Sequence, residues 1–295
     1  MTYKHSGELF LSGAIFLWSF AAFFMQALNK YANGLQIVFW VNLVATGFLA
    51  LVITFRRSWS FWSHWKEWIA SILWVAAIIG ILSYILLFKA AALTNPNNIA
   101  ILNLTQILFG FMIYSILRIE TVKIRAIVGS AIMIIGAFFV LYQDGFSFNR
   151  GDLLVLGANL CFVIGNIYQK KVRKVLGSYQ ILFLRSIISA FFLSILLLVS
   201  SEGISTDFPI QFWIIMSIMG VFVFCIEKVC WIEAIHRMAI NRASSLSAIT
   251  PALTILWGIL FFDQPPSLLQ TIGFIIMFIG AWYILRNKNL FQVLS

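Results

Sequence analysis

The sequence predicts an all-α integral membrane protein of ten transmembrane helices, arranged as two inverted five-helix repeats. Three observations predict this fold class: an apolar composition, ten long apolar segments, and a similarity between the two halves at one fixed offset. Hydrophobic residues make up 62% of the chain and charged residues 10%, against roughly 45–50% and 25% in soluble proteins. A soluble domain cannot bury so much apolar surface, whereas lipid tails are a solvent for it.

Ten segments are apolar enough to cross a bilayer, whose core of roughly 30 Å requires about 20 helical residues. The break between the third and fourth spans rests on Pro96, because proline disfavours a helix at the residue before it. The predicted spans are 8–28, 34–55, 68–88, 95–117, 123–142, 151–170, 178–200, 210–235, 241–262 and 267–286.

The basic residues predict the orientation of these spans. With the N-terminus in the cytoplasm, the cytoplasmic segments hold fifteen Lys and Arg residues and the outer segments hold Lys30 and Arg150. The fifteen are Lys4, Arg56, Arg57, Lys66, Arg118, Lys123, Arg125, Lys170, Lys171, Arg173, Lys174, Arg237, Arg242, Arg286 and Lys288. Cytoplasmic loops carry such an excess. We therefore expect a multi-pass protein of the cell inner membrane with both termini in the cytoplasm.

Four tryptophans follow the second predicted span at near-helical spacing, with basic residues between them. These are Trp59, Trp62, Trp65 and Trp68. An indole suits the headgroup layer, where the ring can face lipid and the N–H can face water. We expect this segment to anchor the chain at the membrane interface.

The two halves match when one is shifted by 144 positions. The matches include Gly, Asn and Gln, whose coincidence in a membrane protein is less expected than that of Leu or Ile. Examples are Gly7 with Gly151, Gly13 with Gly157, Gln36 with Gln180, Asn97 with Asn241, Gly129 with Gly273, and Gly136 with Gly280. An odd number of spans in each repeat places the repeats in opposite orientations. Inverted repeats are typical of secondary transporters, which alternate access around a central site.

The fifth and tenth spans repeat a pattern of two glycines seven residues apart. Gly129 and Gly136 lie in the fifth span, and Gly273 and Gly280 in the tenth. Small residues on one helix face allow close approach of another helix. We expect these spans to form a structural rim or a dimer surface.

The end of the second half resembles the EamA-like branch of the drug/metabolite transporter superfamily. The segment Leu246–Leu253 has Pro251 in the fourth helix of the repeat, Asp263 follows at its end, and glycines 273 and 280 punctuate the fifth helix. The resemblance covers nearly all of residues 7–286. It divides the chain into two EamA-like five-helix repeats, 7–142 and 151–286.

The first half departs from the family pattern at one position. Gln106 or Ile107 occupies the place of the proline, while Glu120 keeps the acidic position. The resemblance implies an inner-membrane carrier with a central cavity lined by spans one to four and six to nine. It leaves the substrate open.

Ionisable groups at membrane depth are the clearest candidates for the site, since each costs roughly 2.5–3.5 kcal/mol on insertion scales. Arg185 lies in the seventh span, and Glu227 and Lys228 lie in the eighth. At 1.5 Å per residue, Arg185 and Glu227 lie about 10 and 13 Å from the cytoplasmic face, so we expect them to face each other or to share a cavity. Two interpretations stay open. One is a permanent salt bridge between the spans; the other is a functional role, in which the groups bind a charged or zwitterionic substrate or Glu227 carries a coupling proton.

Neutral polar residues in the cavity-lining spans extend this set. Helix-to-helix hydrogen bonding is the alternative role for each of them. The candidate substrate-binding residues are Arg185, Glu227, Lys228, Trp18, Asn42, Tyr84, Asn103, Gln106, Asn159, Asn166 and Thr250. Near the inner end of the eighth span, Glu233 and Arg237 are four residues apart, which predicts a helix-end ion pair.

Other classes of function lack their sequence features. No P-loop of an ATP-driven pump occurs, and the three histidines, His5, His64 and His236, lie in separate segments, so we predict no enzyme. The net charge of +10 is spread over short loops, unlike a nucleic-acid footprint. No metal-ligand spacing or cofactor motif is present.

The favoured function is a secondary transporter of a small metabolite, for instance an amino acid or related zwitterion, acting by alternating access. The alternative is a lipid or lipid-linked-sugar flippase of the same fold. The expected partners are a small-molecule substrate and membrane lipids, with proton coupling as an option. The protein is expected to be a monomer or a homodimer.

Overall fold

The computed structural model describes residues 3–91, 93–94, 99, 102–141, 149–200, 203–262, 267–286 and 291–293. Expectations that fall on Pro96 and Asp263 lie outside these ranges. The first half contains α1 (Tyr3–Trp18), α2 (Ala21–Leu28), α3 (Gly34–Phe55), η1 (Trp59–His64), α4 (Trp65–Val75), η2 (Ala76–Ser83), α5 (Tyr84–Ala91), α7 (Thr105–Ile116), β1 (Glu120–Val122) and α8 (Ile124–Leu141). The second half contains α9 (Arg150–Val172), α10 (Ser178–Val199), α11 (Ile210–Ile218), η3 (Met219–Ile226), α12 (Glu227–Arg237), α13 (Ile240–Ser247), α14 (Thr250–Phe262), α15 (Leu268–Arg286) and β2 (Phe291–Val293).

The chain is a helical membrane protein with ten helical segments, five in each half. Six of the described segments are long and apolar enough to cross a membrane by themselves, and α7, α8 and α15 supply shorter apolar helices. The ninth segment is divided into α13 and α14, and Pro251 lies in the first turn of α14, where its missing N–H costs nothing. Large apolar side chains such as Phe55 and Val199 are more than 80% exposed, as a lipid-facing surface requires.

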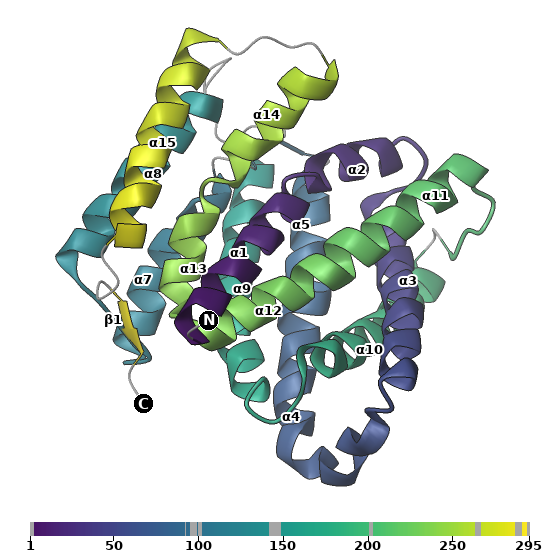
Figure 1. The fold of residues 1–295 in the computed structure, drawn as a ribbon. Coiled ribbons are helices and arrows are strands. Elements are labelled where there is room, and N and C mark those ends of the chain that lie inside the picture. The colour runs from purple at the N-terminus through teal and green to yellow at the C-terminus, as the bar shows by residue number, and fades with distance from the viewer. Residues whose placement is uncertain are drawn as a thin grey trace.

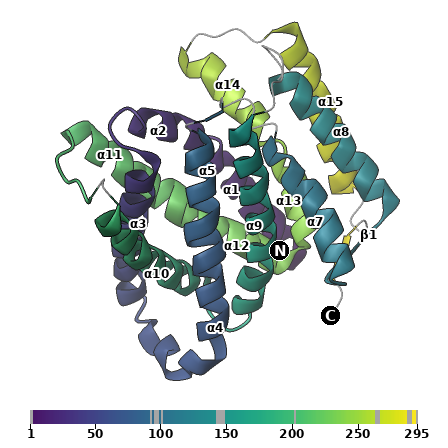
Figure 2. The same ribbon diagram turned by 180° about the vertical axis from the view of Figure 1, so that it is seen from behind.

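Segments of one half pack against segments of the other (Figures 1 and 2). The helix α3 packs along α10, α8 packs along α15, and α1 packs along α12, while α9 packs against α4, η2 and α5. The two halves also repeat one hydrogen bond. Gln36 Nε2 donates to the carbonyl of Gly203, and Gln180 Nε2 donates to the carbonyl of Ser58. These equivalent glutamines lie at opposite ends of the molecule, as inverted repeats require.

Both halves contain a π-helical segment in the third span of the repeat. In the first half this segment is η2 (Ala76–Ser83), and in the second half it is η3 (Met219–Ile226). They are separated by 143 residues, one position from the offset of the sequence repeat. Wide helical turns of this kind occur frequently at functional sites.

The segments predicted to be cytoplasmic gather on one face, here called the basic face (residues 6–8, 56–68, 118–125, 170–180, 233–242, 286 and 291–293). Arg237 donates to Ser6 Oγ, and Gln180 donates to the Ser58 carbonyl. The strands β1 and β2 pair antiparallel, which ties the C-terminal segment to the loop before α8. This short strand pair is an addition to the expected all-α fold.

Glycines bring α8 and α15 into direct backbone contact. A Cβ atom at Gly136 would lie 2.7 Å from the backbone nitrogen of Met277 and 2.8 Å from the carbonyl oxygen of Gly273. A Cβ atom at Gly280 would lie 3.0 Å from the carbonyl oxygen of Gly129. The expected close packing is therefore present, and it joins the two spans to each other at one edge of the molecule (Figure 1).

The tryptophan segment divides between surface and core. Trp62 and Trp65 are about half exposed, at 49% and 50%, which suits the predicted interfacial anchor. Trp68 is 1% exposed, and its indole donates to the carbonyl of Phe61 over 3.0 Å. The anchor prediction was wrong for Trp68, because the first turn of α4 turns this ring into the protein.

Candidate functional site

Five of the predicted site residues meet near the level of the two π-helical segments. Arg185 comes from α10, Tyr84 from the start of α5, Glu227 and Lys228 from the start of α12, and Trp18 from the end of α1. Arg185 interacts electrostatically with both Tyr84 and Glu227. We call this group the central cluster. It contains residues from both halves. The sequence predicted proximity for Arg185 and Glu227, and no particular contact for the other members.

Glu227 pairs with its own neighbour. Lys228 Nζ lies 2.8 Å from Glu227 Oε2, and the same ammonium lies 3.8 Å from the centre of the Trp18 ring, a favourable cation–π distance. No ion pair joins Arg185 to Glu227 within the part of the chain that the structure describes. The permanent salt bridge between the seventh and eighth spans is thus not formed in this structure.

Arg185 is buried without a counter-ion. Its side chain is 1% exposed, and within the described ranges its Nε and Nη2 atoms have no hydrogen-bond partner. The hydroxyl of Tyr84, itself 1% exposed, is also without a partner among these residues. Buried polar groups are nearly always hydrogen-bonded, so this concentration of unused donors makes the central cluster the candidate site.

Sequence reasoning missed Gly80, Ser189 and Cys225, which complete the surroundings of Arg185. A Cβ atom at Gly80 would lie 3.3 Å from Arg185 Cγ and 3.2 Å from Ser189 Cβ, so the backbone of η2 lies directly against this side chain. Ser189 Oγ has no hydrogen-bond partner among the described residues, and the buried thiol of Cys225 lies near Arg185. Small residues in apolar helices are common, and nothing in the sequence separates these three from the rest.

Four other predicted residues have structural hydrogen bonds. Asn42 donates to the Val38 carbonyl of its own helix, and Thr250 donates to the Ser247 carbonyl. Asn159 donates to the Leu102 carbonyl, and Asn166 accepts from the Trp231 indole. Asn159 and Asn166 thus bond from helix to helix, whereas Asn42 and Thr250 bond within their own segments; a role in substrate binding stays a prediction for all four. Asn103 and Gln106 are partly exposed on the segment around α7, and their role in binding stays a prediction.

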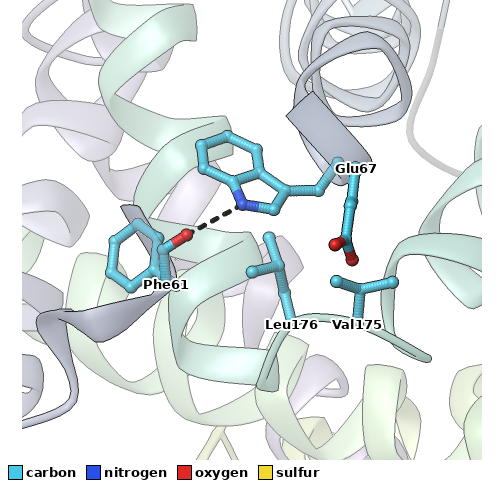
Figure 3. Close-up of a pocket in the computed structure, with 5 residues that line it drawn as sticks. Phe61, Glu67, Val175 and Leu176 are labelled. Atoms are coloured by element: carbon cyan, nitrogen blue, oxygen red, sulfur yellow. Dashed lines mark hydrogen bonds between the residues drawn. The ribbon is translucent and has the colours of Figure 1, made fainter. Parts of the chain in front are cut away.

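A pocket of about 360 Å³ lies at the basic face, away from the central cluster. Phe61, Glu67, Trp68, Val175 and Leu176 line it, with the Glu67 carboxylate beside Val175 (Figure 3). Arg185, Tyr84 and Glu227 of the central cluster are buried instead.

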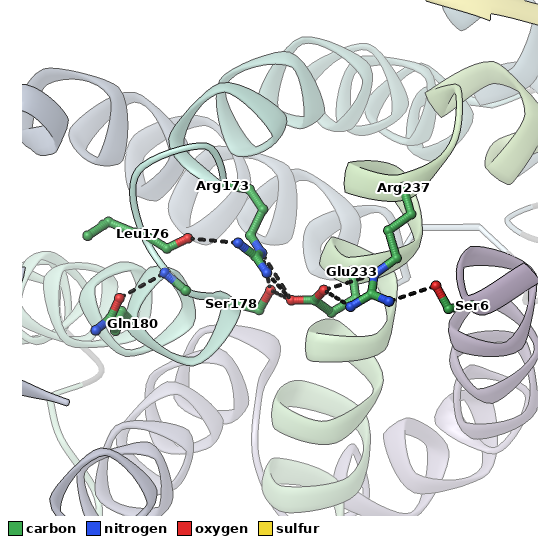
Figure 4. A network of polar contacts seen from close by, with 8 residues as sticks. Ser6, Arg173, Leu176, Ser178, Gln180, Glu233 and Arg237 are labelled. Atoms are coloured by element: carbon green, nitrogen blue, oxygen red, sulfur yellow. Dashed lines mark hydrogen bonds and ion pairs between the residues drawn. The ribbon is translucent and has the colours of Figure 1, made fainter. Parts of the chain in front are cut away.

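An ionic network joins the spans at the basic face (Figure 4). Glu233 Oε1 accepts from Arg173 Nη2 over 2.7 Å, and Glu233 Oε2 accepts from Arg237 Nη2 over 2.9 Å. Ser178 Oγ also donates to Glu233, and Arg237 Nη1 donates to Ser6. The predicted pair of Glu233 and Arg237 is confirmed, but it is largely buried and includes Arg173, which the helix spacing alone did not indicate.

A second link crosses the same face. Glu120 Oε2 accepts from the backbone N–H of Asn241 over 3.0 Å, and Lys170 Nζ lies 3.7 Å from Glu120 Oε1. The carboxylate thereby caps the start of α13, where the helix dipole favours a negative charge. Glu120 belongs to the first half and its partners to the second, so the link holds the halves together at this face.

The fold and the central cluster define a polytopic membrane protein with duplicated halves and a buried polar site between them. The family model of the EamA-like transporter family matches residues 5–142 and again residues 149–286. The chain belongs to the EamA-like transporter family, within the drug/metabolite transporter superfamily. It is a multi-pass membrane transporter and not an enzyme, and a transporter implies a small-molecule substrate.

This chain is distantly similar in sequence to the following two proteins. A probable 4-amino-4-deoxy-L-arabinose-phosphoundecaprenol flippase subunit, ArnF of Serratia proteamaculans, is 28% identical over 91 residues, which cover 30% of this chain and 70% of that protein. An uncharacterised transporter of Clostridium kluyveri is 24% identical over 200 residues, covering 65% of this chain and 64% of its own length. A solved crystal structure shares the fold with a TM-score of 0.75 at 18% identity, covering 95% of this chain and 96% of that chain.

Proposed function

We propose that this protein is a secondary transporter of a small charged metabolite, for instance an amino acid or related zwitterion, which binds at the central cluster. The observation that carries the proposal is Arg185, a buried cation without a counter-ion on the inner side of two inverted repeats. Ionisable groups inside membrane proteins mark substrate or ion pathways, and inverted repeats place such sites near the bilayer midplane.

Alternating access would act through the contacts at the basic face. The Glu233 network joins α12 and α1 to the connection between α9 and α10. Opening the basic face breaks these bonds, and closing it forms them again. We further propose that this face is cytoplasmic and that the membrane is the cell inner membrane, since the basic segments gather there.

Uptake into proteoliposomes tests the proposed function. We expect purified protein to catalyse saturable counterflow of at least one solute from a panel of amino acids, amines and organic acids. The variants Arg185→Gln and Glu227→Gln should each lose most of this activity, because each removes a charge from the central cluster. Wild-type rates in both variants and in the double variant would show that transport does not use these groups.

Coupling to protons is tested by a second measurement on the same vesicles. If Glu227 carries the coupling proton, Glu227→Gln loses the response of the uptake rate to an imposed pH gradient. Asp207→Asn is the matched control, because Asp207 is exposed in the segment before α11 and lies outside the central cluster. If the uptake rate of Glu227→Gln still responds to the pH gradient as in wild type, Glu227 does not carry a coupling proton.

A lipid-linked substrate is the alternative function, favoured by the similarity to the ArnF flippase subunit. The similarity covers 30% of this chain, so it supports the class of substrate weakly. Translocation of a fluorescent lipid that depends on its headgroup, without uptake of any soluble solute, would favour this alternative.

A further inference from the structure

The guanidinium of Arg185 forms no ion pair with any residue that the structure describes. The group is 1% exposed, and two of its nitrogens lack a hydrogen-bond acceptor. A buried charge without a partner is strongly destabilising, so such groups are retained where a ligand satisfies them. Arginine also keeps its charge in proteins, which excludes neutralisation by loss of a proton.

Two hydroxyl groups near Arg185 have unused hydrogens. Ser189 lies one helical turn beyond Arg185 on α10, and its Oγ has no partner among the residues described. The Tyr84 hydroxyl interacts electrostatically with Arg185 and is likewise unpartnered there. Gly80 brings the π-helical backbone against both Arg185 and Ser189. The cluster therefore presents a fork of N–H donors with O–H donors nearby, on adjacent spans.

The local charges leave an excess of one positive charge. Arg185 and Lys228 are positive and Glu227 is negative. Lys228 already neutralises Glu227 at 2.8 Å, so the carboxylate that would otherwise pair with Arg185 is engaged. An acidic group on a bound solute would neutralise the remaining positive charge.

We propose that Arg185, together with the hydroxyls of Tyr84 and Ser189, is the subsite for the carboxylate group of the transported solute. The inference rests on the proposed function and names its substrate class. The planar fork of a guanidinium matches the two oxygens of a carboxylate, which an ammonium or a single hydroxyl does not. A simple organic acid and a zwitterionic amino acid share this group, and both fit the assignment.

Ligand-induced thermal stabilisation of the purified full chain tests the subsite. The probes are a matched four-carbon series, butyrate, 2-aminobutyrate and butylamine, with inorganic phosphate as a further anion. Each is added at about 50 mM against sodium chloride of equal ionic strength, a concentration at which a ligand with a Kd of about 1 mM stabilises clearly. We expect butyrate, 2-aminobutyrate or both to raise the Tm by about 3–5 °C, and butylamine to have no effect.

Variants assign the stabilisation to Arg185. Arg185→Met should fold, because replacing an unpaired buried charge by an apolar side chain removes its desolvation cost, and it should lose the whole acid-dependent shift. Arg185→Lys should retain a small part of the shift, since it keeps the charge without the fork. Lys174→Met, at an exposed position in the connection between α9 and α10 and outside the central cluster, should keep the shift. Tyr84→Phe removes one hydroxyl and should reduce the acid-dependent shift in Tm. If Arg185→Met fails to fold, the result for Tyr84→Phe decides the test.

Several results would overturn the assignment. They are an absence of any shift with either acid, an equal shift with butylamine or with inorganic phosphate, and a full acid-dependent shift in Arg185→Met. The outcome is separate from that of the proposed function. Acid binding without solute uptake would support the carboxylate subsite and contradict the proposed transport function. Uptake of an amine that is independent of Arg185 would support the transport function and contradict the subsite.

Discussion

Replacing Glu233 by Gln is expected to open the basic face of the protein. The carboxylate accepts hydrogen bonds from two guanidinium groups, those of Arg173 and Arg237, and a hydrogen bond to a charged group contributes about 1.5–3 kcal/mol. A neutral amide retains part of this bonding and loses the ionic part. A loss of about 2 kcal/mol shifts the ratio of closed to open protein roughly 30-fold towards the open state.

The measurement is the distance between spin labels across the network. Leu9 on α1 is 64% exposed, and Lys174 is exposed in the connection between α9 and α10, so labels at these positions report separation of the two sides. The three native cysteines are free and are replaced beforehand. We expect Glu233→Gln to broaden and lengthen the distance distribution.

Glu67→Gln is the matched control for this experiment. Glu67 is an exposed carboxylate at the same face and lines the neighbouring pocket, yet it forms no ion pair among the described residues. Its replacement changes the surface charge by the same amount. Equal distance distributions in wild type and Glu233→Gln, or the same change in both variants, would mean that the network does not hold this face closed.

Gly136→Ala is expected to destabilise the pair formed by α8 and α15. The new Cβ atom would meet backbone atoms of α15 at 2.7 and 2.8 Å, and backbone cannot rotate away as a flexible side chain can. Overpacking of this kind costs about 1–3 kcal/mol, occasionally more, and we expect the upper part of that range. Thermal denaturation of purified protein in detergent measures the change.

Gly47→Ala is the matched control for helix packing. Gly47 lies in α3, and a Cβ atom there would meet nothing within 4 Å. Alanine favours the helix over glycine by about 1 kcal/mol, so this variant should be as stable as wild type or more stable. A similar loss of Tm in both glycine variants would show that the effect arises from helix propensity and not from contact with α15.

The boundaries of most spans followed from the sequence. The predicted spans 34–55 and 178–200 correspond to α3 (Gly34–Phe55) and α10 (Ser178–Val199), and 267–286 corresponds to α15 (Leu268–Arg286). Agreement is close because the thickness of the bilayer sets the length of an apolar segment. The division of the ninth segment and the π-helical turns depend on contacts between spans. The periodicity of the sequence predicts neither feature.

The sequence predicted the depth of the candidate site residues in the membrane, but not which side chains they would contact. Arg185 and Glu227 were expected at similar depth, and they do interact electrostatically. Glu227 nevertheless pairs with Lys228, its neighbour in the chain, which helix spacing does not predict. Ser189 was overlooked because a serine has no special weight in an apolar helix until its neighbours are known.

The sequence by itself determined that this chain lies in a membrane, where it crosses, that its halves are repeated, and which family it resembles. Composition and residue count suffice for these conclusions, since lipid imposes one length scale and a small set of allowed structures. Only the tertiary structure decided which side of each helix faces the protein. A rotation of a helix about its axis changes no residue's depth, and it is fixed by the close contacts of small residues such as Gly80 and Gly136. In the resulting arrangement Arg185 has no ion pair among the described residues, and Glu233 lies between Arg173 and Arg237.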